Sequence, residues 1–79
     1  MKEYSLWQNL KRNLKQPLWQ RIETGGTGRG IPDVFGVLEG HCCWVELKIA
    51  RGNKVNLSAE QVGWLIKFSR AGLRTFILV

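Results

Sequence analysis

The sequence has few of the residues that mark secreted or zinc-binding proteins. It contains one histidine, His41, and two cysteines, which are adjacent at Cys42 and Cys43. Neighbouring side chains of an extended segment point to opposite faces, so these two thiols are not expected to bridge each other. No Cys-x-x-Cys pattern is present, and a zinc site is not expected. These features predict a reduced, intracellular protein.

Long apolar runs are also missing. Lys2, Glu3, Lys11 and Arg12 interrupt the beginning of the chain, so no signal peptide is expected there. No apolar stretch reaches the length that a membrane-spanning helix needs. We therefore expect no membrane partner.

Acidic residues are scarce. Six Asp and Glu stand against 12 Lys and Arg, which gives a formal net charge of +6. Such an excess on a small domain favours a polyanionic partner, usually nucleic acid, although a simple role in solubility is the plainer alternative. The length of 79 residues suits one domain over residues 1–79. A core this small would gain from a bound metal or a second copy.

Hydrophobic spacing and turn residues predict an α/β (α+β) fold in the order α-β-β-β-α-β, with a mixed sheet flanked by helices. The predicted elements are a helix over 4–15, strands over 18–24, 33–38 and 41–49, a helix that Ser58 opens and Gly72 ends, and a strand over 75–79. The last strand is apolar throughout, so it is expected to be buried.

The second helix carries apolar residues on more than one side. Val62, Leu65 and Ile66 are expected to face the core, with Trp64 and Phe68 turned away. A two-fold partner resting on Trp64 and Phe68 would cover this second set. The pattern therefore predicts a homodimer, which also suits the small core.

Asp33, Glu46 and Lys48 form the chemically informative set. Side chains alternate along a strand, so Glu46 and Lys48 share one face. A turn at Glu39-Gly40 places Asp33 opposite a residue close to Glu46. Two acids and a lysine are therefore expected to converge at one end of one hairpin.

Two adjacent carboxylates repel unless a cation neutralises them, and Mg²⁺ prefers such oxygen ligands. A bound Mg²⁺ or Mn²⁺ suits phosphodiester hydrolysis, with Lys48 orienting water or stabilising charge on phosphate. The backbone carbonyl of Leu47 is a further candidate ligand. The alternative is an ion pair of Glu46 with Lys48 on a wet strand, with Asp33 as a turn residue.

The segment Gly30-Ile31-Pro32-Asp33, the twelve residues that follow, and Glu46-Leu47-Lys48 resemble the PD-(D/E)XK nuclease superfamily. Within it, the chain looks like the stand-alone VRR-NUC domains of phages and bacteria, and its layout is similar to that of archaeal Holliday junction resolvases. The resemblance implies a small restriction-endonuclease-like fold in the cytoplasm of a bacterium or a phage-infected host.

The resemblance also implies roles for individual residues. Asp33 and Glu46 would bind metal, and Lys48 would assist the attacking water. A glutamate on the first helix reaches the metal in this superfamily, and Glu3 is the candidate here; its alternative is a favourable charge at a helix N-terminus. A glutamine on the later helix recurs, and Gln61 matches it. Gln61 also fits a capping box with Ser58, and both roles can hold at once.

Basic residues on two loops are the candidate DNA contacts. Arg29 lies in the glycine-rich loop over 25–30, and Arg51 and Lys54 lie in the loop after the Glu-x-Lys strand. Glycines would let the backbone and Arg29 approach a DNA phosphate closely.

These observations favour a metal-dependent endonuclease that hydrolyses DNA, selective for branched DNA such as four-way (Holliday) junctions and acting as a homodimer. The alternative is a non-catalytic basic nucleic-acid-binding module, which would have no need of Asp33 and Glu46. A structural protein with a tryptophan-rich dimer interface is a third option, and it leaves the charges in an apolar strand unexplained.

Overall fold

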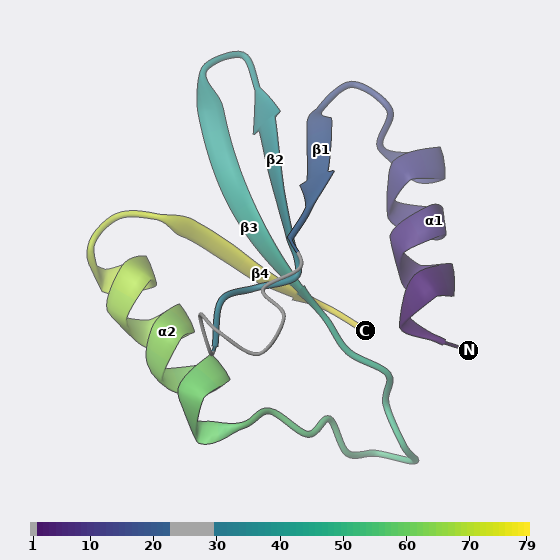
Figure 1. Cartoon of the computed structure of the whole chain (residues 1–79), viewed down its shortest axis with the longest axis vertical. Helices are drawn as coiled ribbons and strands as arrows, with labels where there is room; N and C mark the ends of the chain where they lie inside the picture. The colour runs from purple at the N-terminus through teal and green to yellow at the C-terminus, as the bar shows by residue number, and fades with distance from the viewer. Residues whose placement is uncertain (1, 23–29) are drawn as a thin grey trace.

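The computed structural model describes residues 2–22 and 30–79 of the chain. The elements are α1 (Glu3–Asn13), β1 (Leu18–Arg21), β2 (Val34–Leu38), β3 (His41–Leu47), α2 (Ala59–Arg70) and β4 (Arg74–Leu78), as Figure 1 shows. The fold is α+β, with the predicted element order. The four strands form one mixed sheet in the order β1-β2-β3-β4, with a helix on each face.

The β2–β3 hairpin has the register that its turn predicts. Glu39 and Gly40 both have positive φ, the conformation of a two-residue turn between twisted antiparallel strands. Val34 consequently pairs with Val45 at the far end of the ladder. β3 then pairs in parallel with β4, and α2 makes the crossover between these two strands.

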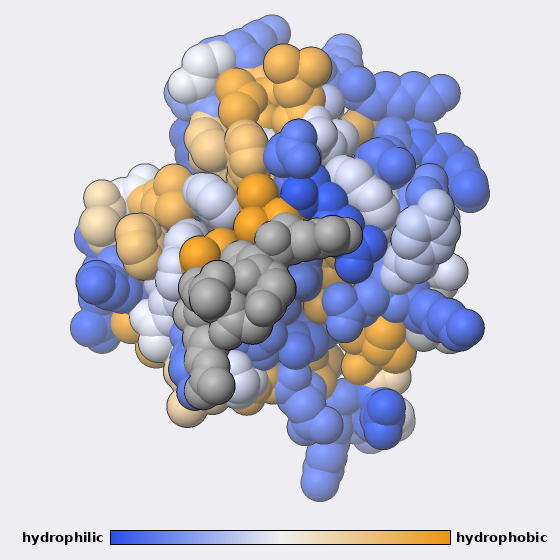
Figure 2. Space-filling model, viewed as in Figure 1, coloured by the Kyte–Doolittle hydropathy of each residue, from blue (hydrophilic) through white to orange (hydrophobic). Residues whose placement is uncertain are grey.

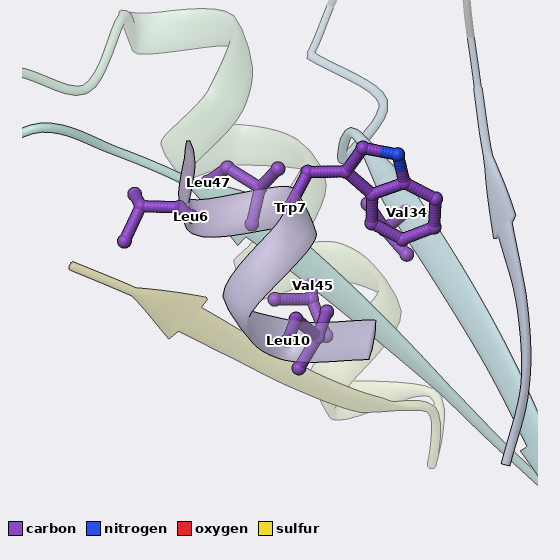
Figure 3. Close-up of a cluster of buried hydrophobic side chains, with 6 residues drawn as sticks. All are labelled: Leu6, Trp7, Leu10, Val34, Val45 and Leu47. Carbon is purple, nitrogen blue, oxygen red and sulfur yellow. The ribbon is translucent and has the colours of Figure 1, made fainter. Parts of the chain in front are cut away.

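The core lies between α1 and one face of the sheet. Leu6, Trp7 and Leu10 project from α1 onto side chains of β2 and β3 (Figure 3). The sheet residues of this cluster are Val34, Val45 and Leu47. The alternation of the hairpin strands thus buries Val45 and Leu47 under α1 and turns Glu46, between them, to the α2 face.

α1 is shorter than the sequence predicts. It ends at Asn13, and Leu14, expected to continue the apolar stripe, is exposed. Leu14 has left the helical conformation, and its carbonyl accepts a hydrogen bond from the indole Nε1 of Trp19 over 2.8 Å. This bond turns the chain from the helix into β1.

The prediction for the faces of α2 is wrong for Val62, Ile66 and Trp64, whereas Leu65 is half-buried, as Trp64 is. Trp64 packs against Trp44 of the sheet, with 5.4 Å between ring centroids, and stacks on Phe68. Val62 and Ile66, expected in the core, are exposed. A helix with apolar residues on two sides does not reveal its rotation from spacing alone. Trp64 and Phe68 are therefore not a free surface for a partner.

The predicted burial of the last strand is also wrong. Among the described strands, β4 pairs with β3 alone and so lies at an edge of the sheet. Phe76 is 55% exposed and Ile77 is 44% exposed. Several separate hydrophobic patches likewise reach the face seen in Figure 2. No helix within 2–22 and 30–79 has the length and apolar character needed to cross a membrane.

Candidate active site

Asp33 is held in place from both sides. It follows Pro32, which is fully buried, and immediately precedes β2. Its carbonyl accepts a hydrogen bond from the backbone N–H of Ile22 over 2.7 Å. On its other side, its carboxylate Oδ2 accepts one from the backbone N–H of Leu47 over 2.9 Å. The carboxylate therefore stands at the end of the hairpin farthest from the turn, as predicted.

Glu46 is buried although it carries an acidic side chain. Its exposed fraction is 2%, and its carboxylate lies under the first turn of α2. Oε1 accepts a hydrogen bond from Nε2 of Gln61 over 3.1 Å. Oε2 is buried and has no hydrogen-bond partner among residues 2–22 and 30–79. A buried, unpartnered carboxylate oxygen is costly unless a proton or a cation satisfies it.

The surroundings of Glu46 favour its protonated form. Burial is the largest cause and the nearby Asp33 carboxylate the next, and together they raise the pKa of Glu46 to about 8. When protonated, Glu46 can share its proton with Asp33, and when ionised the two negative charges repel. The charge of Lys48 lowers this pKa, and that of Glu3 raises it. Asp33, Lys48 and Glu3 thus all lie close enough to act on Glu46.

Lys48 and Glu3 share a surface hollow whose lining includes neither Asp33 nor Glu46. This shallow hollow lies between the start of α1 and the segment after β3, and Arg51 also lines it. Within the described residues, no three His, Cys, Asp or Glu side chains lie close enough to hold a metal ion together. The structure therefore brings Asp33 and Glu46 together, and Glu3 does not form a three-acid cluster with them.

Two of the predicted DNA contacts lie side by side. Arg51 and Lys54 pair through their backbones across a two-residue turn, with N···O distances of 2.9 and 3.1 Å. Gly52, with a φ of 62°, supplies the positive φ that the turn needs. Residues that oppose each other in such a pair project to the same side, so the turn concentrates two exposed cations. Arg29, the third candidate, lies outside the described residues.

The donors present fit a hard divalent cation. Asp33 and Glu46 offer carboxylate oxygens, the ligand type that Mg²⁺ and Mn²⁺ prefer. A cation beside Oε2 of Glu46 would satisfy the buried side-chain oxygen that lacks a partner in the described part of the chain. Leu47 contributes its N–H to this region, and its carbonyl as a ligand stays a prediction.

The site agrees with the comparison to known families. Residues 7–79 match the family described as archaeal Holliday junction resolvase (Hjc). The chain belongs to this family. Membership in the Hjc family, whose nucleases are PD-(D/E)XK-like, implies nuclease activity on DNA and agrees with the resemblance found in the sequence. The narrower likeness to VRR-NUC domains stays a prediction, and a search of the curated proteins found no match.

Gly30, in the sequence motif of this Hjc family member, has a structural role that the sequence does not reveal. Gly30 has a φ of 85°, and a Cβ built on it would lie 2.3 Å from the carbonyl oxygen of Glu60. Gly30 therefore lets the segment that leads to Asp33 lie directly on the first turn of α2. Its place at the end of a glycine-rich run hides this role, because such a run indicates only a loop.

Proposed function

We propose that residues 1–79 form one nuclease domain that hydrolyses DNA phosphodiester bonds with Mg²⁺ or Mn²⁺, with four-way junctions as the preferred substrate. The observation that carries this proposal is the state of Glu46. It is buried beside a second acid, with one oxygen fixed by Gln61 and the other without a partner among the residues that the structure describes. A protein that only needs to fold gains nothing from this costly arrangement.

In this proposal Asp33 and Glu46 hold the cation, with the carbonyl of Leu47 as a further ligand. Such a cation, when bound, would supply Lewis-acid chemistry, which activates phosphoryl oxygens and water. Glu3, whose charge acts on Glu46, would be a further acid for the cation.

The remaining residues of the site act on Glu46, water or phosphate. Lys48 carries three donors and no acceptor, so it serves by orienting the attacking water or stabilising charge on the phosphate. Gln61 fixes the Glu46 carboxylate through its hydrogen bond.

The same proposal assigns the DNA backbone to the basic residues. Arg51 and Lys54 bind phosphate, because they form an exposed pair of cations close to Lys48 along the chain. Arg29 is proposed for the same role on the basis of its sequence position. These contacts position the substrate and read no base sequence.

A homodimer is the proposed acting form. A two-fold axis would set two sites at a fixed distance, as paired cuts in a branched substrate require. The support is the apolar side chains that α2 and β4 leave exposed: Val62, Ile66, Phe76 and Ile77. Sedimentation equilibrium at micromolar concentration tests this part, because a single species of 9.1 kDa would exclude the dimer.

The experiment that tests the function compares three DNA substrates: a supercoiled circle, a linear duplex and a four-way junction. Each is incubated with the protein alone, with Mg²⁺, with Mn²⁺, and with Mg²⁺ plus a chelator. We expect cleavage only where the free metal is present, and faster cleavage of the junction than of the duplex. Binding to all three substrates without cleavage under any condition would favour the non-catalytic module instead.

A further inference from the structure

Gln61 uses both ends of its side-chain amide. Its Oε1 accepts a hydrogen bond from the backbone N–H of Ser58 over 2.9 Å, and its Nε2 donates one to Oε1 of Glu46 over 3.1 Å. The Oγ of Ser58 in turn accepts a hydrogen bond from the backbone N–H of Gln61 over 3.1 Å. The capping box that begins α2 is therefore bonded directly to the buried acid.

This chain of bonds fixes which way the Gln61 amide points. If the amide were reversed, its NH₂ group would face the N–H of Ser58, and its oxygen would face the carboxylate of Glu46. Two donors would then oppose each other at one end, and two acceptors at the other. The cap thus selects the orientation in which Gln61 supplies Glu46 with a donor.

The same turn of α2 is anchored to the segment that precedes Asp33. The Cβ position of Gly30 falls 2.3 Å from the carbonyl oxygen of Glu60 and 3.3 Å from the backbone nitrogen of Gln61. No side chain fits between the two backbones there. The first turn of α2 therefore meets the approach to Asp33 through Gly30 and meets Glu46 through Gln61.

We propose that Ser58 is a positioning residue for the cleavage reaction, because its capping box holds the Gln61 amide so that Oε1 of Glu46 is occupied and Oε2 is left for the cation. This inference rests on the proposed metal-dependent nuclease function. Ser58 itself is exposed and bonds to Glu46 only through Gln61. Its influence should therefore depend entirely on Gln61.

Three substitutions at Ser58 separate the contribution of its hydroxyl from that of its backbone N–H. Ser58→Thr keeps the hydroxyl and the backbone N–H. Ser58→Ala removes the hydroxyl alone, and Ser58→Pro removes both the hydroxyl and the N–H that donates to Oε1 of Gln61. The φ of −70° at Ser58 suits proline, so the last change is compatible with the local backbone. We expect the Mn²⁺ affinity of Ser58→Thr to be close to that of the unaltered protein and that of Ser58→Ala to be a few-fold weaker. For Ser58→Pro we expect a loss of roughly tenfold, the smallest loss typical when a residue that hydrogen-bonds to a metal ligand is changed.

The matched control loosens the other end of the same helix. Gly72 has a φ of 100° and open space where a Cβ would lie, so Gly72→Ala strains only the backbone. Gly72→Ala should lower stability and leave Mn²⁺ affinity unchanged. An equal loss of affinity in Gly72→Ala and Ser58→Ala would reduce the role of Ser58 to general helix stability and overturn the proposal.

The decisive comparison is made by calorimetric titration with Mn²⁺ in a Gln61→Ala background. If Ser58 acts through Gln61, Ser58→Ala causes no further loss of affinity there. A loss as large as in the unaltered protein would overturn the proposal, and so would full Mn²⁺ affinity in Ser58→Ala or Ser58→Pro.

The link is also tested without metal or DNA, by the NMR signals of the Gln61 side-chain NH₂ group. We expect these signals to move in Ser58→Pro and in Glu46→Gln, and to stay in place in Gly72→Ala. Unmoved signals in Ser58→Pro would overturn the proposal. Failure of the nuclease function would instead appear as an unaltered protein that neither binds Mn²⁺ nor cuts DNA while these signals behave as expected.

Discussion

The carboxylate of Asp33 accepts a hydrogen bond from the backbone N–H of Leu47 over 2.9 Å. Asp33 lies one position beyond Val34, and Leu47 two positions beyond Val45, which are the last paired residues of the β2–β3 ladder. One carboxylate oxygen of Asp33 thereby accepts a hydrogen bond from a strand N–H, as backbone carbonyls do elsewhere in the sheet. The same acid lies close enough to Glu46 to raise its pKa. Asp33 thus joins two tasks: it closes the end of the hairpin and supplies half of the acidic pair.

These two tasks separate in different substitutions of Asp33. Asp33→Asn keeps an oxygen for the N–H of Leu47 and loses the charge, whereas Asp33→Ala loses both. We expect urea denaturation to show nearly unchanged stability for Asp33→Asn and a loss of about 1–3 kcal/mol for Asp33→Ala, because a buried N–H is left unsatisfied. Equal stability of the two variants would contradict the structural task of Asp33.

The raised pKa of Glu46 predicts a dependence of stability on pH. The unfolded chain loses this proton near pH 4.5, and the metal-free folded protein holds it until about pH 8. The unfolded state therefore binds fewer protons across this window, so the free energy of unfolding falls as pH rises from about 4.5 to about 8. The fall is expected to be on the order of a few kcal/mol.

Glu46→Gln isolates this contribution, because glutamine has a similar shape and does not titrate. The difference in stability between the unaltered protein and Glu46→Gln, followed by urea denaturation without divalent metal, should change across this window in favour of the variant as pH rises. A difference that stays constant from pH 4.5 to pH 8 would show that Glu46 titrates normally in the folded protein.

The hairpin that carries the acids was predictable from the sequence. Glu39-Gly40 fixes the turn, the turn fixes the register, and the register places Asp33 beside Glu46. Alternation along β3 then decides that Glu46 faces away from α1. These are local rules over few residues, and the structure follows each of them.

The placement of α2 was not predictable in the same way. Apolar side chains at positions 62, 65 and 66 and at positions 64 and 68 offer two possible faces, and helical spacing favours neither. The contact of Gln61 with Glu46 turns toward the sheet the residues three and four positions later, Trp64 and Leu65, which belong to different predicted faces. This contact joins residues 15 positions apart and depends on the folded sheet.

Lys48 should affect chemistry and leave metal binding intact. A protonated lysine cannot be a metal ligand, so its part lies with the water or the phosphate. We expect Lys48→Ala to lose at least a hundredfold in cleavage rate, as for removal of one electrostatic donor. Titration with Mn²⁺ should give an affinity no weaker than that of the unaltered protein. Loss of Mn²⁺ binding in this variant would make Lys48 part of the structure of the metal site instead.

Two glycines offer a matched test of the packing. A Cβ on Gly36 would lie 2.4 Å from the ring of Trp19, whereas one on Gly63, inside α2, would meet no atom within 4 Å. Gly36→Ala should therefore destabilise the protein by about 1–3 kcal/mol. Gly63→Ala should stabilise it by roughly 0.5–1 kcal/mol, because alanine favours the helix. Thermal denaturation of both variants checks the contact, and a harmless Gly36→Ala would contradict the placement of Trp19.

The most direct test of the account is cleavage of a four-way junction in saturating Mg²⁺ by the unaltered protein and by Glu46→Gln. Glutamine can keep a hydrogen bond to Gln61, and circular dichroism establishes that the variant is folded. We predict that the unaltered protein cuts the junction and that Glu46→Gln loses at least a thousandfold in rate, several kcal/mol of transition-state stabilisation. A folded Glu46→Gln that cuts at a near-normal rate would contradict the assignment of this buried acid to the hydrolytic centre.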